Sequence, residues 1–267
     1  MTESPVALIT GASRSIGLAI ATSLAATGAR LTLTARNPDV LGEAAENLAA
    51  AGTEVLAIAG DVADPGHAPD VVTRTLGRFG QLDTLVNNAG GEGEYRTPVQ
   101  STNPGLWWNT LAVNTYGPYL FARAALPGML ERGSGRIITV ASRAGIIPQA
   151  LASAYCVAKT AVIRLTEVLA TETAGTGVSV FCLHPGGVVN DRLAELMERG
   201  LLSEFRMTDS AQAAGEFVAA LASGHYDALS GEYLDVHDDL DDLLAACAND
   251  PGPQRVLRVT GLAGLTR

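Results

Sequence analysis

Short apolar runs alternate with longer amphipathic segments along most of the chain. The runs are rich in Val, Ile and Leu and predict strands at Val6–Thr10, Leu31–Ala35, Val55–Ala59, Leu82–Asn87, Arg136–Ala141, Val178–Leu183 and Glu232–Val236. The amphipathic segments predict helices at Ile16–Thr27, Pro38–Ala51, Pro69–Phe79, Pro104–Leu130, Ala152–Thr173 and Ala211–Leu221. Apolar strands separated by helices indicate an α/β fold, with a mainly parallel seven-stranded sheet covered by helices on both faces.

The alternating pattern continues to about residue 248. No internal repeat, low-complexity tract or linker rich in Pro, Gly and Ser interrupts it. We therefore expect a single domain over residues 1–248 and a C-terminal tail over residues 249–267. Within the domain we expect an irregularity at Pro118 in the long helix and a loop-rich stretch from Pro185 to Met207.

Charge and composition exclude several classes of protein. The net charge of −10 and the pI near 4.8 repel phosphate backbones, so we expect no nucleic acid partner. No apolar run reaches the ~18 residues of a membrane helix, and no signal peptide precedes the first strand, so we expect a cytoplasmic protein without membrane contact. Cys156, Cys182 and Cys247 are too scattered for a disulfide framework or a metal site, and we expect buried, reduced thiols.

The basic residues are distributed in an unusual way. Of the 18 basic residues, all but Lys159 are arginine. At a solvated surface the two residue types are nearly equivalent, whereas a buried site can require a compact ammonium that a guanidinium does not imitate. The single lysine therefore indicates a functional position.

A glycine-containing turn connects the first strand to the first helix. Its sequence, Thr10-Gly11-Ala12-Ser13-Arg14-Ser15-Ile16-Gly17, lets backbone amides approach a pyrophosphate at a helix N-terminus. The spacing differs from the usual G-x-G-x-x-G pattern, so the turn alone does not identify a dinucleotide site.

Further motifs follow this turn in a fixed order along the chain. They are Asp61-Val62, Asn87-Asn88-Ala89-Gly90, Asn114, Ser142, Tyr155-x-x-x-Lys159 and Pro185-Gly186. With these motifs, residues 4–240 resemble the short-chain dehydrogenases/reductases, in their shorter branch. The resemblance implies a Rossmann-like, doubly wound fold and a nicotinamide cofactor. Ser15 departs from it, because the family usually has Gly there, but a small side chain still permits close approach.

The resemblance also implies the residues that hold the cofactor. It assigns the phosphate turn to Gly11, Ser13, Arg14, Ser15, Ile16 and Gly17, the adenine edge to Asp61 and Val62, and the ribose wall to Asn88, Ala89 and Gly90. No carboxylate ends the second strand, where an NAD-binding member would hold the ribose hydroxyls, and Arg36 comes next. Arg36 and Arg14 together suit a ribose 2′-phosphate, so we expect NADP(H).

Tyr155 and Lys159 are four residues apart and therefore share one face of a helix. The resemblance assigns Tyr155 as the general acid and base, and Lys159 as the group that lowers the pKa of its hydroxyl and holds the nicotinamide ribose. It further implies that Ser142 binds the reacting oxygen and that Asn114 holds a water linking Lys159 to solvent.

Pro185-Gly186-Gly187-Val188 resembles the family's turn beside the nicotinamide carboxamide. Asn190 stands where the family commonly has Thr, and an amide can still make that contact. His184 stands where Asn is common; it is either a second acid–base group or an ordinary histidine at a strand end.

Three stretches are expected to frame the substrate, at Gly91–Thr97, Arg143–Leu151 and Val189–Met207. Their mixture of residues predicts a largely apolar pocket for a small carbonyl or alcohol substrate. After the last strand the family often has Asp-Gly-Gly, whereas this chain has His237-Asp238-Asp239, followed by acidic residues that can begin a helix.

The resulting hypothesis is an NADP(H)-dependent reductase of a ketone or aldehyde, of the 3-oxoacyl-reductase or specialised-metabolism type. Two alternatives stay open: an NADP-dependent alcohol dehydrogenase working in the oxidative direction, and an NADP-sensing binding protein without turnover. Trp107 and Trp108 lie in the helix that commonly forms the subunit interface of the family, so we expect a homodimer or homotetramer.

Overall fold

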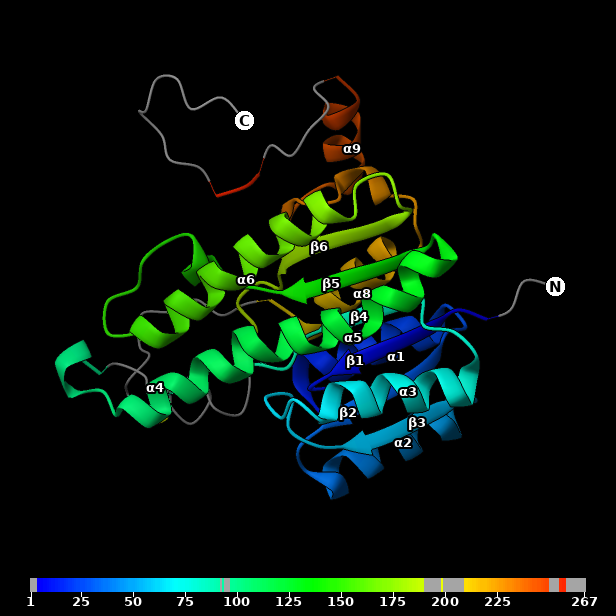
Figure 1. The fold of residues 1–267 in the computed structure, drawn as a ribbon, viewed down its shortest axis with the longest axis horizontal. Helices are drawn as coiled ribbons and strands as arrows, with labels where there is room; N and C mark the ends of the chain where they lie inside the picture. The colour runs from blue at the N-terminus through cyan, green and yellow to red at the C-terminus, as the bar shows by residue number, and fades with distance from the viewer. Residues whose placement is uncertain are drawn as a thin grey trace.

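The computed structural model describes residues 4–91, 93, 97–189, 198, 209–249 and 255–257. Asn190, most of the two outer substrate stretches and most of the C-terminal tail lie outside the described residues. The described part contains one seven-stranded sheet in the order β3-β2-β1-β4-β5-β6-β7, with every neighbouring pair parallel (Figure 1). This arrangement confirms the expected doubly wound α/β fold.

The strands begin and end within about two residues of their predicted positions. They are β1 (Val6–Thr10), β2 (Arg30–Ala35), β3 (Val55–Ala59), β4 (Thr84–Asn87), β5 (Gly135–Val140), β6 (Val178–His184) and β7 (Tyr233–Asp235). Because all seven are parallel, their carboxyl ends meet at one edge of the sheet. The predicted site residues follow these ends, which is where open α/β sheets bind ligands.

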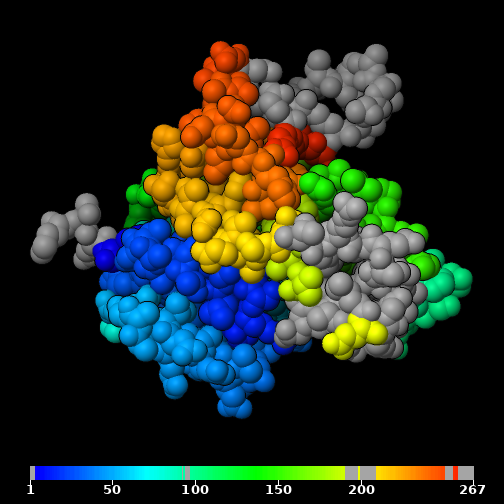
Figure 2. All heavy atoms as spheres, turned by 180° about the vertical axis from the view of Figure 1, so that it is seen from behind, coloured from blue at the N-terminus to red at the C-terminus, as the bar shows by residue number. Residues whose placement is uncertain are grey.

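Helices cover both faces of the sheet. They are α1 (Ser15–Ala26), α2 (Pro38–Ala50), α3 (His67–Phe79), α4 (Pro104–Leu111), α5 (Gly117–Arg132), α6 (Ser153–Glu172), α8 (Ala211–Ala222) and α9 (Leu240–Asn249). Figure 1 shows α3, α5 and α6 lying across one face. Figure 2 shows the opposite side, where α1 (blue) lies beside α8 (yellow to orange).

Each face has its own apolar core, as the alternation of side chains in a strand requires. Ala7 and Ile9 of β1 pack with α1, α2 and α8, whereas Leu8 packs with α3 and α5. The sheet is therefore buried on both sides, in agreement with its continuous apolar strands. None of the helices within the described ranges combines the length and apolar character that crossing a bilayer requires.

The predicted long helix is interrupted before Pro118. It consists of α4, a π-helical turn over Ala112–Tyr116, and α5. Pro118 lies just after the π turn within a continuous helical segment, where its ring and missing N–H exclude the regular hydrogen bond to the carbonyl of Asn114, so the expected irregularity at Pro118 is confirmed. The acidic run begins a helix as expected, since Asp241 and Asp242 occupy the first turn of α9.

The three thiols are free, but only one is fully buried. Cys182 is in the core, and burial raises the pKa of its thiol to about 12. Cys156 and Cys247 are half-buried, so the expectation that all three are buried is wrong for these two. Both lie on helices near the surface, where an apolar residue need not be covered completely.

Candidate active site

The turn between β1 and α1 is fitted tightly against the end of β4. Gly11 adopts a φ of +65°, which favours glycine, and a Cβ on Gly17 would lie 2.1 Å from the Gly11 carbonyl oxygen. The side-chain amide of Asn88 donates to the carbonyl oxygens of Thr10 (2.9 Å) and Gly11 (3.2 Å). The amides at the start of α1 are thus held in the arrangement that suits a pyrophosphate.

The Thr10 hydroxyl joins the turn to β4. It accepts hydrogen bonds from the backbone N–H groups of Asn88 and Ala89, both at 3.0 Å, and donates to Val86 O at 3.4 Å. Thr10 belongs to the glycine-turn motif, but the sequence pattern indicates no role for its hydroxyl. Its partners are 76 to 79 residues away in sequence, so no local pattern indicates them.

Ser15 occupies a backbone conformation that favours glycine. Its φ is +48°, in the left-handed region that L-residues avoid. This explains in physical terms why a glycine suits the position. The chain retains the turn with serine there, at the cost of local backbone strain.

The cofactor-facing end of β2 carries no carboxylate. Ala35 ends the strand, Arg36 is exposed, and Asn37 caps α2 by accepting from the N–H groups of Asp39 and Val40. The N–H of Ala12 donates to Thr34 O at 3.2 Å, which brings the turn that contains Arg14 against this strand end. Arg36 forms no ion pair with any described residue.

The neighbouring strand ends place the other expected cofactor residues along the same edge. Asp61 is exposed after β3, and Val62 is buried with its side chain against Gly117. Gly90 lies against the amide of Asn114, since a Cβ there would be 2.8 Å from Asn114 Oδ1. The small residue at position 90 thus leaves room beside the catalytic candidates.

Tyr155 and Lys159 lie on one face of α6, as their spacing predicts. The ammonium of Lys159 lies 5.6 Å from the centre of the Tyr155 ring and donates to Val140 O at 2.9 Å. Lys159 is only 4% exposed, so α6 carries a buried positive charge to the end of β5. Tyr155 itself is half-buried.

Ser142 follows β5 and is positioned by the turn after it. Its hydroxyl accepts from Ala144 N at 3.2 Å at the start of a short 3₁₀ turn, Arg143–Gly145. Gly145 packs directly on α6, where a Cβ would lie 2.7 Å from the backbone of Lys159, and its carbonyl accepts from the Thr160 hydroxyl at 2.8 Å. The structure thereby brings Ser142 and the Tyr155–Lys159 face of α6 to one edge.

Asn114 lies in the π-helical turn and is almost fully buried. Its amide donates to Gly91 O at 2.7 Å and to Thr110 O at 2.9 Å, and its Oδ1 accepts from Gly91 N at 3.4 Å. The Thr115 hydroxyl next to it donates to Ala158 O of α6 at 3.2 Å. A π turn is frequent at functional sites, and here it aims Asn114 at the segment after β4.

The turn after β6 is braced by a residue that sequence reasoning did not single out. Gly186 has a φ of +83°, and a Cβ there would lie 2.7 Å from an oxygen of Asp209. The same carboxylate accepts from Gly187 N at 2.7 Å. His184 precedes this turn; burial lowers its pKa, and its Nδ1 has no partner among the described residues.

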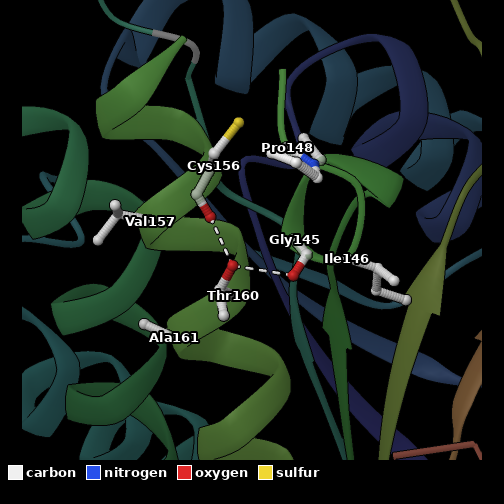
Figure 3. Close-up of a pocket in the computed structure, with 8 residues that line it drawn as sticks. Gly145, Ile146, Pro148, Cys156, Val157, Thr160 and Ala161 are labelled. Carbon is white, nitrogen blue, oxygen red and sulfur yellow. Dashed lines mark hydrogen bonds between the residues drawn. The ribbon is translucent and has the colours of Figure 1, made fainter. Parts of the chain in front are cut away.

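A cavity of about 400 Å³ lies on the other side of α6 (Figure 3). It is lined by Ala144, Gly145, Ile146, Pro148, Cys156, Val157, Thr160 and Ala161. Ser142, Tyr155 and Lys159 are not among its lining residues. Of the three stretches expected to frame the substrate, the middle one, Arg143–Leu151, therefore contributes several of its residues to this cavity.

Comparison with known proteins identifies the family. A family model described as short chain dehydrogenase matches residues 5–199. The short chain dehydrogenase mpl6 of Monascus purpureus is 35% identical over 244 residues, which are 89% of this chain and 82% of that protein.

Solved structures agree over most of the chain. A variant of actinorhodin polyketide ketoreductase with NADPH gives a TM-score of 0.82 at 30% identity, covering 87% of this chain and 95% of that one. A 3-oxoacyl-[acyl-carrier protein] reductase from Brucella melitensis in complex with NAD gives 0.81 at 29% identity, covering 88% and 96%.

The family model, together with solved neighbours that hold NADPH or NAD, defines the class as oxidoreductases that use a nicotinamide cofactor. The chain belongs to the short-chain dehydrogenase/reductase family, which acts on alcohols and ketones. One structural neighbour holds NADPH and another holds NAD. Membership of the family therefore establishes a nicotinamide cofactor, but it does not establish whether that cofactor carries a 2′-phosphate.

Proposed function

We propose that the protein is an NADP(H)-dependent reductase of a small ketone or aldehyde, with Tyr155 as the general acid. The observation that carries this proposal is the convergence of Ser142, Tyr155 and Lys159 at the sheet edge where the glycine turn also lies. A ketone reductase is favoured because two structural neighbours are a polyketide ketoreductase and a 3-oxoacyl reductase.

NADP(H) is favoured over NAD(H) by the end of β2. Arg36 is exposed there, no carboxylate follows the strand, and the turn that contains Arg14 is hydrogen-bonded to β2 through Ala12. Guanidinium groups bind a phosphate through paired, charge-assisted hydrogen bonds, whereas a carboxylate would repel it. The 2′-phosphate is therefore assigned to Arg14 and Arg36.

The rest of the cofactor is assigned to the residues along the same edge. Backbone groups of Gly11, Ser13, Ser15, Ile16 and Gly17 hold the pyrophosphate, Asp61 and Val62 the adenine, Asn88, Ala89 and Gly90 the ribose, and Pro185, Gly186, Val188 and Asn190 the carboxamide. The bound cofactor supplies a hydride to the carbonyl carbon.

Side chains of the protein stabilise the negative charge that develops on the carbonyl oxygen. The Ser142 hydroxyl donates a hydrogen bond to this oxygen, and the Tyr155 hydroxyl transfers its proton to it. Lys159 holds the nicotinamide ribose and, by its charge, favours the tyrosinate that remains. Asn114 binds the water through which Tyr155 recovers its proton from solvent.

A homodimer or homotetramer is proposed from the surface formed by α4, the π turn, α5 and α6. Exposed apolar side chains gather there: Leu106, Trp108, Tyr116, Tyr119, Val157 and Val168. Trp107 is different, since its indole N–H donates to Ser153 Oγ at 3.1 Å within the subunit. Trp108, which is 67% exposed, is therefore the tryptophan assigned to the interface.

The proposed function is tested by following NADPH absorbance with a panel of ketones and aldehydes, and NADP⁺ reduction with the matching alcohols. Faster turnover with NADPH than with NADH is expected, together with a preference for ketone reduction near neutral pH. Tight NADPH binding without turnover across the panel would instead support a binding protein, and faster turnover with NADH would contradict the assignment of Arg14 and Arg36.

A further inference from the structure

A relay of charged groups connects the end of β7 to the turn after β6. His237 Nδ1 lies 2.7 Å from Asp235 Oδ1, and its Nε2 lies 2.9 Å from Asp209 Oδ1. The second oxygen of Asp209 accepts from Gly187 N at 2.7 Å. Because both carboxylates are acceptors, the bridge is complete only when both ring nitrogens donate, that is, when the histidine is an imidazolium.

Asp209 is in direct contact with the backbone of the turn. A Cβ on Gly186 would lie 2.7 to 2.9 Å from three atoms of the Asp209 side chain, and Asp209 N donates to Gly187 O at 3.2 Å. The position of this carboxylate therefore constrains the backbone of Gly186 and Gly187. The histidine restrains Asp209 from the side opposite the turn.

Asp235 is the fixed end of the relay. Its side chain is 9% exposed, and Oδ2 accepts from Arg143 Nε at 3.1 Å and Nη2 at 2.8 Å. Arg143 follows Ser142 directly, so the same carboxylate anchors the segment that carries the catalytic serine candidate. One relay thus links the two sides of the site.

We propose that His237 is a positioning residue for the nicotinamide end of the cofactor, because its imidazolium bridges Asp235 and Asp209 and so holds the Gly186–Gly187 turn in place. This inference rests on the proposed function, which assigns the carboxamide to that turn.

The relay makes cofactor binding depend on pH. The charged and titratable groups around His237 are Asp235 and Asp238 on its own segment, Asp209 before α8, His184 of β6 and Arg143 after β5. Hydrogen bonds to Asp235 and Asp209 raise the pKa of His237 above 6.5. The bridge is complete below pH 6.5 and is lost as the pH rises through the raised pKa, since a neutral imidazole donates from one nitrogen only.

The test compares whole cofactors with fragments that lack the nicotinamide ribose. Dissociation constants are measured for NADPH and adenosine 2′,5′-bisphosphate, and for NADH and ADP, with the wild type, His237→Ala and His237→Gln. His225→Ala is the matched control, because His225 is an exposed histidine 4.0 Å from Asp241 and remote from the turn. Thermal melts accompany every variant.

We expect His237→Ala to weaken the binding of the whole cofactors by about 3- to 10-fold, because one charge-assisted restraint is lost. Binding of the fragments should weaken by less than about 2-fold. The ratio of fragment to whole-cofactor dissociation constants should fall more steeply between pH 6 and pH 9 in the wild type and in His225→Ala than in His237→Ala, where only the titration of the fragments' terminal phosphate near pH 6 contributes. His237→Gln should resemble His237→Ala, because one amide cannot donate to both carboxylates.

If His237→Ala weakens the binding of fragments and whole cofactors equally, or changes neither, the inference is overturned and the proposed function still stands. A wild type that binds ADP better than adenosine 2′,5′-bisphosphate would overturn only the choice of NADP(H). A wild type that binds neither whole cofactor would overturn the proposed function and the inference together. His237→Gln keeps the test decisive where His237→Ala fails to fold, because either variant separates the contribution of His237 from the titration of the fragments' terminal phosphate.

Discussion

The ammonium of Lys159 is hydrogen-bonded to the main-chain oxygen of Val140 at 2.9 Å, so α6 is attached to the last residue of β5. Ser142 follows two residues later, and Tyr155 lies one helical turn before the lysine. The position is 4% exposed, which leaves little room for a larger group. A compact donor is thus needed both for the geometry of the strand end and for the proposed contact with the ribose.

Lys159→Arg should therefore lose most turnover although it preserves the charge. A planar guanidinium is larger and directs its donors in a fixed fork, so it does not reproduce the hydrogen bond to Val140 and the proposed ribose contact together. We expect turnover to fall by at least about 100-fold, near the level of Lys159→Ala, with weaker NADPH binding. Lys159→Met, which keeps the length of the stem, is the control for packing.

The measurement is kcat and NADPH affinity for the three variants, with a thermal melt of each. Near-normal turnover in Lys159→Arg would mean that charge alone is required. It would also remove the explanation for a single lysine among 18 basic residues.

Tyr155→Phe should retain the fold and cofactor binding and abolish turnover, because it removes only the hydroxyl. General acid catalysis by one side chain contributes about 10²- to 10⁴-fold, and we expect kcat to fall within that range or below detection. Tyr226→Phe is the matched control, since the Tyr226 hydroxyl binds Asp241 at 3.0 Å on α9, outside the site. Steady-state kinetics on one good ketone checks both variants.

Substantial turnover in Tyr155→Phe would mean that another group supplies the proton. His184 is the group to test next, because its Nδ1 has no partner among the described residues. Its pKa is lowered by burial, which leaves it mostly neutral at pH 7 and able to exchange a proton only in more acidic solution.

The sequence predicts the elements of this fold closely because both strand and helix carry a clear periodic signal. In the long helix, Pro118 correctly predicts an irregularity, and the π turn lies just before it. Proline cannot donate to the carbonyl four residues earlier, so the local signal at Pro118 coincides with the defect in the helix.

The candidate site is predictable where spacing along one element decides it, as for Tyr155 and Lys159. Contacts between distant segments leave no such pattern: Thr10 meets Asn88 across 78 residues, and Asp209 meets His237 across 28. Threonine and aspartate are common at loop positions, so only the folded arrangement distinguishes these two. The same holds for Gly145, whose contact with Lys159 depends on packing against α6.

Arg36→Asp should change the cofactor preference. It removes a guanidinium and places a carboxylate where the 2′-phosphate is proposed to lie, whereas the ribose hydroxyls of NADH can donate hydrogen bonds to a carboxylate. We expect NADPH affinity to fall by about 10- to 100-fold and NADH affinity to change by less than about 3-fold. Arg74→Asp, on the exposed face of α3, is the charge-matched control.

Fluorescence titration with both cofactors provides the measurement for the Arg36 variants. If Arg36→Asp weakens the binding of NADPH and NADH equally, the arginine acts only through the overall electrostatic field of the protein. The control then matters, because Arg74→Asp changes the net charge by the same amount and should leave both affinities nearly unaltered.

Ser15→Gly should stabilise the protein, although glycine is normally destabilising at the start of a helix. The φ of +48° costs an L-residue about 1–2 kcal/mol, and glycine avoids this cost while losing about 0.4–1 kcal/mol through the entropy of the unfolded chain. The net gain in the free energy of unfolding should reach about 1 kcal/mol. Ser13→Gly, in the same turn without a positive φ, should instead lose stability by about 0.4–1 kcal/mol. The free energy of unfolding of both variants is measured by urea denaturation. If Ser15→Gly loses as much stability as Ser13→Gly, the backbone at Ser15 is not strained.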